Sequence, residues 1–117
     1  IAVPSCSFTS LTSPNGYIYH CDCNMVPGIL EIGEIGNVAG LIAPRHLLAV
    51  NGIKDKLHRP ADTERAAKHT KAIFTAANCP DHFEHRWGQE GHRFYKDLMW
   101  DFVMNIIKIE KGKCTNY

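Results

Sequence analysis

The sequence predicts an α+β domain, on three observations. An Asn15-Gly16 pair between two β-prone runs is typical of a hairpin near the start of the chain. Residues 62–77 have helical periodicity, and residues 100–109 are rich in β-branched and aromatic side chains. Because the predicted strands and helices come in blocks and do not alternate, we expect an α+β class, with one domain spanning residues 1–117.

The predicted hairpin joins residues 5–11, in which small polar and apolar side chains alternate, to the aromatic run at residues 17–21. The Asn-Gly pair favours the turn because both residues tolerate a positive φ angle. Folding the chain about this turn brings Cys6 opposite the end that carries Cys21 and Cys23. A disulfide between Cys6 and Cys23 is therefore geometrically allowed.

A first helix is predicted over residues 29–42, where apolar residues recur every three or four positions. Three glycines oppose it, since each costs about 1 kcal/mol in a helix interior relative to alanine. Pro44 ends the helix, and an Asn-Gly pair at residues 51–52 marks a turn before a basic loop at residues 54–59. The apolar stripe consists of Ile29, Ile32, Ile35, Val38 and Ile42.

The clearest predicted element is the helix over residues 62–77, which has one apolar stripe among charged residues. Pro60 precedes it, and the Asn-Cys-Pro sequence at residues 78–80 stops it. The β-branched and aromatic run at residues 100–109 then predicts one or two strands in the core of the domain.

Composition narrows the class of partner and the compartment. A formal net charge of +1 does not favour a polyanion as the main partner, so any contact with RNA would be local. Five cysteines in so short a chain favour secretion, with two disulfides and one spare thiol. The chain starts at Ile1 without a signal sequence, which we interpret as a mature secreted protein, and no apolar run is long enough to span a membrane.

Two short motifs carry a family resemblance. The order of elements, together with Tyr19-His20-Cys21 near the start and Lys113-Cys114-Thr115 near the end, resembles the ribonuclease-like secreted effectors of cereal powdery-mildew fungi. Those proteins are similar in fold to the fungal guanyl-specific ribonucleases. The resemblance implies one or two helices packed on a curved antiparallel sheet. It also implies a disulfide that ties the start of the chain to its end, from Cys21 or Cys23 to Cys114.

The same resemblance implies a function. A secreted virulence effector of this kind is delivered into the cytoplasm of a host plant cell, binds host proteins and sometimes RNA, and is open to detection by an immune receptor, which makes it an avirulence factor. The segment at residues 79–102 resembles part of the ribonuclease site, with His82 and Asp101 at acid-base positions. Aspartate replaces the family's glutamate, however, and too little chain follows residue 105 to supply the later arginine and second histidine. The implied scaffold is therefore catalytically inactive.

Two alternatives stay open, an active secreted ribonuclease or ribotoxin and an unrelated disulfide-stapled binding domain. RNA cleavage through a cyclic phosphate needs a base, an acid and a cation. His82, Glu84, His92 and Asp101 are the candidates for proton transfer.

Zinc is a weaker interpretation of the same region, and we expect no metal or other cofactor. Cysteine and histidine at close spacing can hold a tetrahedral zinc ion, but a secreted cysteine is more often oxidised. The zinc-competent residues are Cys79, His82, His85 and His92. The candidates for contact with a partner are Lys54, Lys56, Arg59, Arg86, Trp87 and Arg93.

Overall fold

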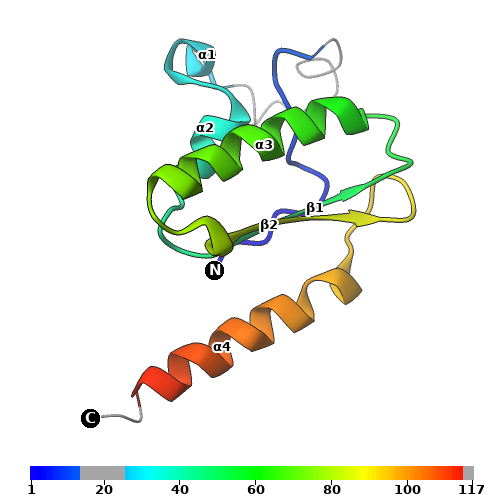
Figure 1. Cartoon of the computed structure of the whole chain (residues 1–117). Coiled ribbons are helices and arrows are strands. Elements are labelled where there is room, and N and C mark those ends of the chain that lie inside the picture. Colours follow the sequence, from blue (N-terminus) through cyan, green and yellow to red (C-terminus); the bar gives the residue numbers. More distant parts are fainter. Residues whose placement is uncertain (14–25, 115–117) are drawn as a thin grey trace.

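The computed structural model of the chain describes residues 1–13 and 26–114. In this part of the chain, helices surround a small central sheet (Figure 1). The elements are α1 (Ile29–Ile32), α2 (Ile35–Gly40), β1 (Leu47–Gly52), α3 (Pro60–Ala76), β2 (Phe83–Gly88) and α4 (Trp100–Cys114), with short 3-10 turns at Pro80–His82 and Lys96–Leu98. The predicted mixture of helices and strands is confirmed.

The sheet is built on a strand-helix-strand unit. β1 and β2 pair in parallel, starting with Leu47 opposite Phe83, and α3 forms the crossover that a parallel pair requires. On the other side of β1, the start of the chain adds two parallel bridges, from Ala2 to Leu47 and from Ser5 to Val50. β1 is therefore the central strand. All of its residues are buried, as is typical of a strand that is covered on both faces.

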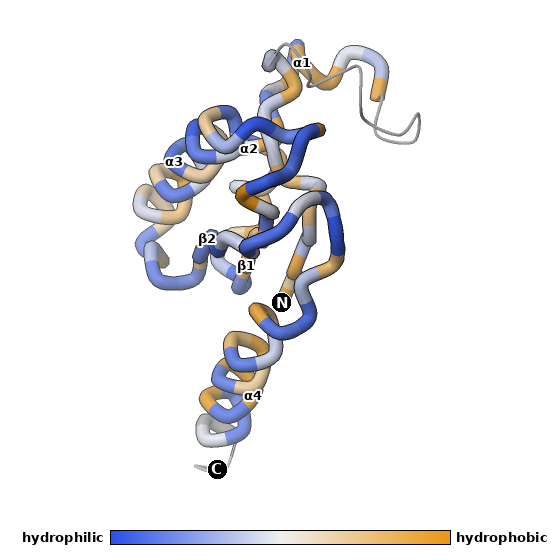
Figure 2. The backbone as a smooth tube through the Cα atoms, turned by 90° about the vertical axis from the view of Figure 1, so that its right-hand side faces the viewer, coloured by the Kyte–Doolittle hydropathy of each residue, from blue (hydrophilic) through white to orange (hydrophobic). Residues whose placement is uncertain are grey.

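The two faces of the sheet are covered by different helices. Alternate residues of a strand point to opposite faces, so β1 contributes to two separate apolar clusters. The cluster on the side of α2 and α3 includes Phe8, Leu47, Ala49, Phe74 and Phe83. The cluster on the side of α4 consists of Leu48, Val50, Phe102 and Ile106. Figures 1 and 2 show the same arrangement from two directions, with α3 and α4 on opposite sides of the strands.

The predicted middle helix is confirmed as α3, which begins at Pro60 and ends at Ala76. Proline suits the first helical position because its missing N–H has no partner there in any case. The predicted helix over residues 29–42 forms two short helices that are separated at Gly33 and Glu34. The Glu34 side chain caps α2 by accepting a hydrogen bond from the Ile35 N–H.

The prediction of an antiparallel sheet is wrong, because the described strands are parallel. The error lies in residues 47–52, where we predicted no strand and only a turn at residues 51–52, whereas the structure forms the central strand. A strand that is buried on both faces is a continuous apolar run and lacks the alternation that identifies a half-buried strand. The predicted turn at the Asn51-Gly52 pair is also wrong, because both residues belong to β1 and the turn follows at residues 53–54.

The predicted strands at residues 100–109 are also wrong, because this run lies within α4. The buried residues Phe102 and Ile106 are four apart, which places them on one face of a helix. Contact of this face with β1 outweighs the strand propensity of the β-branched side chains, which is a weak and context-dependent preference.

The predicted N-terminal hairpin is only partly testable. Within residues 5–11 the structure shows a single bridge, at Ser5, and no strand, while residues 17–21 lie outside the described part of the chain. Cys6 is a buried free thiol in the structure, which does not favour the possible disulfide to Cys23, a residue outside the described ranges. No disulfide joins residues that the structure describes. Cys21 and Cys23 lie outside them, so the tie to Cys114 stays a prediction.

Among the helices in the described ranges, none is both long and apolar enough to cross a bilayer.

Candidate functional site

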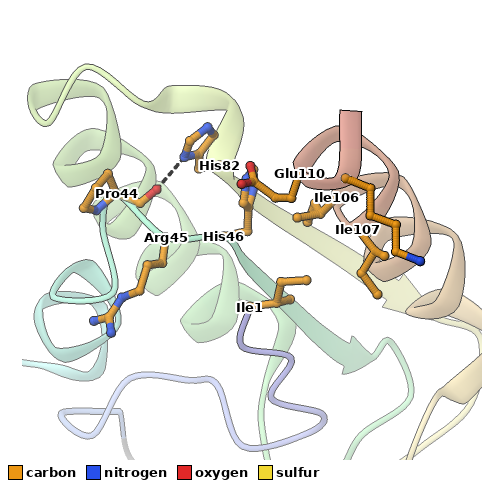
Figure 3. A pocket seen from close by; sticks show the side chains of 9 residues that line it. Ile1, Pro44, Arg45, His46, His82, Ile106, Ile107 and Glu110 are labelled. Atoms are coloured by element: carbon orange, nitrogen blue, oxygen red, sulfur yellow. Dashed lines mark hydrogen bonds between the residues drawn. The ribbon is translucent and has the colours of Figure 1, made fainter. Parts of the chain in front are cut away.

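A groove of about 750 Å³ lies between α4 and the amino ends of the parallel segments (Figure 3). Three chain segments approach it from the sheet. They are Ile1, just before the bridge at Ala2, residues 44–46, just before β1, and His82, just before β2. The last turns of α4 form the opposite wall. The lining residues are Ile1, Pro44, Arg45, His46, His82, Ile106, Ile107, Glu110 and Lys111.

Two histidines form the wall on the sheet side. The rings of His46 and His82 lie with their centroids 3.9 Å apart. The Nδ1 atom of His82 makes a short hydrogen bond to the carbonyl oxygen of Pro44, which Figure 3 shows as a dashed line. A carbonyl oxygen can only accept, so Nδ1 is the donor and carries a proton. This hydrogen bond fixes the orientation of His82 against the loop that leads into β1.

The wall from α4 is apolar. Ile106 is buried beneath the helix, and its neighbour Ile107 is 36% exposed and lines the groove. Hydrophobic residues also lie on the exposed side of the helix. They are Trp100, Met104 and Ile109. Figure 2 shows hydrophobic positions over most of α4 and hydrophilic ones near its end. A helix that is apolar on several faces is normally covered on more than one of them, so α4 presents a surface suited to an apolar ligand.

An ion-pair network holds the start of α4 against β2. The Arg86 guanidinium donates to Glu84 and to Asp101, each with a shortest distance of 2.6 Å, and also to the carbonyl oxygen of Leu98. Hydrogen bonding to Glu84 is the largest of the effects that raise the pKa of Arg86 further above its ordinary value. The hydrogen bond from Arg86 likewise lowers the pKa of Asp101. Charge-assisted bonds of this kind fix where α4 begins and hence where its groove-facing residues lie.

Charged groups flank the apolar part of the groove. Arg45 and Lys111 are cationic side chains, whereas Glu110 is the only carboxylate among the lining residues. Figure 3 shows the Glu110 carboxylate directed toward His46, on the inner side of the groove. The lining therefore carries a net positive charge around an apolar surface.

The predicted nuclease residues are distributed over separate places. His82 lines the groove, while His92 lies beyond the other end of β2, where its Nδ1 atom is 2.9 Å from Asp55 Oδ2. Glu84 and Asp101 both bind Arg86. Of the four candidates, only Glu84 and Asp101 are brought together, and a shared arginine separates their carboxylates.

The predicted partner-binding residues are partly committed to internal contacts. Arg86 belongs to the network above, and Trp87 is half-buried with its ring edge-on to His85. Arg59 pairs with the buried Asp62 at the start of α3. The remaining members of the set, which are exposed, are Lys54, Lys56 and Arg93. Lys54 pairs with Glu90, and the Arg93 guanidinium lies over the Tyr95 ring.

The zinc-competent set from the sequence is not assembled. Cys79 is buried in the cluster beneath α3, His82 lies in the groove, and His85 contacts Asn51. Sequence reasoning also missed the groove itself, because its walls come from four distant segments. The only local signal was the mixture of isoleucines and charges near the end of the chain.

No protein-family model, no curated protein and no solved structure matches this chain, so the resemblance to ribonuclease-like effectors stays a prediction.

Proposed function

We propose that this protein is a binding protein whose groove takes an amphiphilic anion, with an unbranched apolar chain and a carboxylate head of the fatty-acid class. The observation that carries the proposal is an apolar groove, lined by Ile1, Ile106 and Ile107, whose lining also includes the cationic residues Arg45 and Lys111. Such a lining complements a molecule that is apolar along its body and negative at one end.

The size of the groove suits a small ligand. Its volume of about 750 Å³ lies within the range of roughly 300–1,000 Å³ that is usual for small-molecule sites. Burial of each additional methylene is worth about 0.8 kcal/mol, which corresponds to about a fourfold gain in affinity. We therefore expect affinity to rise about fourfold with every methylene until the chain fills the groove.

The sign of the charge provides the second test. Arg45 and Lys111 outnumber the single carboxylate of Glu110, so an anionic head group is attracted and a cationic one is repelled. Octanoate, decanoate and dodecanoate are compared by calorimetry with dodecyltrimethylammonium, which has the same chain as dodecanoate and the opposite charge. Weaker binding of the cation at equal chain length is the expected result.

Matched variants on α4 locate the site. Ile107→Asp places a carboxylate in the groove, whereas Ile109→Asp places one at an exposed position of the same helix that does not line it. Similarly, Lys111→Gln removes a lining charge, while Lys108→Gln removes a neighbouring one outside the groove. We expect the lining variants to weaken dodecanoate binding at least about tenfold, which corresponds to about 1.4 kcal/mol of binding free energy. The matched controls should bind dodecanoate like the parent protein. Equal loss in both members of a pair would contradict the proposal.

The secreted-effector hypothesis stays a prediction beside this one. Its implied scaffold depended on an antiparallel sheet, which is replaced here by a parallel one. The active-ribonuclease alternative is tested by an RNA-degradation assay. Turnover that disappears in His82→Ala or His92→Ala would support a ribonuclease, and absence of turnover in the parent protein would support a role in binding.

A further inference from the structure

Three chemically reactive side chains meet at the carboxyl end of the sheet, opposite to the groove. Cys6 follows the bridge at Ser5, Asp55 follows β1 and His92 follows β2. Each thus lies just beyond the end of one of three parallel segments. Loops at this edge of a parallel sheet converge, which is why ligands of such sheets bind there.

The donor atoms of these residues are close enough to share one ion. The Cys6 sulfur, an Asp55 carboxylate oxygen and a His92 ring nitrogen all lie within 4.8 Å of one another. His92 Nδ1 is 2.9 Å from Asp55 Oδ2, and the Cys6 thiol donates to the carbonyl oxygen of Arg93 at 3.1 Å. Small shifts of side chains would bring all three donors to the bond lengths of about 2.0–2.3 Å that zinc requires.

The surroundings of Asp55 call for a cation. Its side chain is 0% exposed, and its Oδ1 atom accepts a hydrogen bond from the Leu57 N–H. In the described residues, the side chains that face its Oδ2 atom are two histidines, His92 and His58, with no lysine or arginine. The second of these is farther away, with 4.0 Å from His58 Nδ1 to Asp55 Oδ2. A buried carboxylate is costly unless it is paired or bound to a metal ion.

The backbone at Cys6 is also unusual. Its φ angle is +52°, a left-handed conformation that a residue other than glycine seldom adopts. The Cys6 residue is only 4% exposed. Strained backbone of this kind is found preferentially at binding and catalytic sites.

We propose that Cys6, Asp55 and His92 bind a divalent transition-metal ion of the zinc class. Thiolate, carboxylate and imidazole are all ligands of zinc, and one thiolate with one carboxylate neutralises the two charges of the ion, which suits a buried site. On binding, the Cys6 thiol loses its proton to solvent and exchanges its hydrogen bond to Arg93 for a bond to the metal. The His92 side chain is 46% exposed, so water reaches the fourth coordination position. The inference is independent of the groove.

The test uses reduced, chelator-treated protein titrated with Co²⁺ and then Zn²⁺. Cobalt reports thiolate coordination through a sulfur-to-metal absorption band, and Zn²⁺ should displace it. Loss of partners outside the ligand shell already costs roughly 10–100-fold in metal affinity, so Cys6→Ala and His92→Gln should each weaken binding at least about 100-fold. Cys79→Ala, which removes the other buried free thiol, and His82→Gln are the matched controls and should bind like the parent protein.

Cys21, Cys23 and Cys114 are present in every variant, so any metal that they hold cancels from the comparison. His92→Gln alters an exposed side chain and should fold even if Cys6→Ala does not, which circular dichroism checks. The proposal is overturned if the parent protein shows no sulfur-to-cobalt band, or if His92→Gln and His82→Gln bind cobalt equally well.

Discussion

His85 should make the protein less stable as the solution becomes acidic. The residue lies in β2 opposite Ala49, and its Nε2 atom is 3.2 Å from the Asn51 Oδ1 atom. The Asn51 amide nitrogen donates to the carbonyl oxygen of Phe8, so its oxygen faces the histidine and accepts from it. Burial lowers the pKa of His85 from 6.5 to about 4, because the charged ring is poorly solvated there.

The sign and size of the effect follow from linkage between protonation and folding. Between pH 6.5 and about pH 4 the unfolded chain binds a proton at His85 that the folded protein does not bind, so stability falls as the pH falls through this window. The full difference corresponds to roughly 3 kcal/mol, at about 1.36 kcal/mol for each pH unit. Partial exposure of the ring reduces the part expressed between about pH 7 and about pH 4.5 to about 2 kcal/mol.

The pH-dependent loss of stability is measured by urea unfolding of the parent protein and of His85→Gln at about pH 7 and about pH 4.5. Carboxylates titrate in both proteins, so their contribution cancels when the two pH-dependent losses are subtracted. The parent protein should lose about 2 kcal/mol more than His85→Gln. Gln89→Ala, which changes an exposed side chain that does not titrate just after β2, is the control and should lose as much as the parent. Identical losses in the parent and in His85→Gln would refute the assignment of a buried, neutral histidine.

Three further predictions concern packing, close approach and capping. Phe102→Ala should lower the free energy of unfolding by about 3 kcal/mol and make the amides of α4 exchange hydrogen faster. Trp100→Ala, at a residue that is 56% exposed, should lower it by less than about 1 kcal/mol. Equal losses in the two variants would contradict the packing of α4 on the sheet. Gly52→Ala places a Cβ atom 2.2 Å from a backbone carbonyl oxygen and should lower the free energy of unfolding in urea by at least about 2 kcal/mol. The Cβ atom of Gly112→Ala meets nothing within 4 Å, so this control should leave the free energy of unfolding unchanged or raise it slightly. Burial opposes the charge of Glu34, but hydrogen bonds from residues 10–12 outweigh it and lower its pKa. Glu34→Gln should therefore cost about 1 kcal/mol near neutral pH, and the cost should vanish as the pH falls through that lowered pKa; a cost independent of pH would exclude the charged cap.

Local pattern determined the elements whose stability is local. The helical stripe of residues 62–77, with proline at its start and an Asn-Cys-Pro stop, predicted α3 to within two residues at its start and one at its end. The mixed class followed from the same kind of reasoning. In each case the periodicity of the side chains and the identity of the residues at the ends carry the information, and neither depends on distant parts of the chain.

Strand direction, the state of residues 100–109 and both candidate sites were decided by tertiary contacts alone. β1 is a continuous buried run, so nothing in its own sequence reports which partner it pairs with or in which direction. The β-branched run became α4 because a helix places Phe102 and Ile106 together on the sheet. Cys6, Asp55 and His92 are separated by tens of residues and meet only because three parallel segments end at one edge, a coincidence in space that no local pattern encodes.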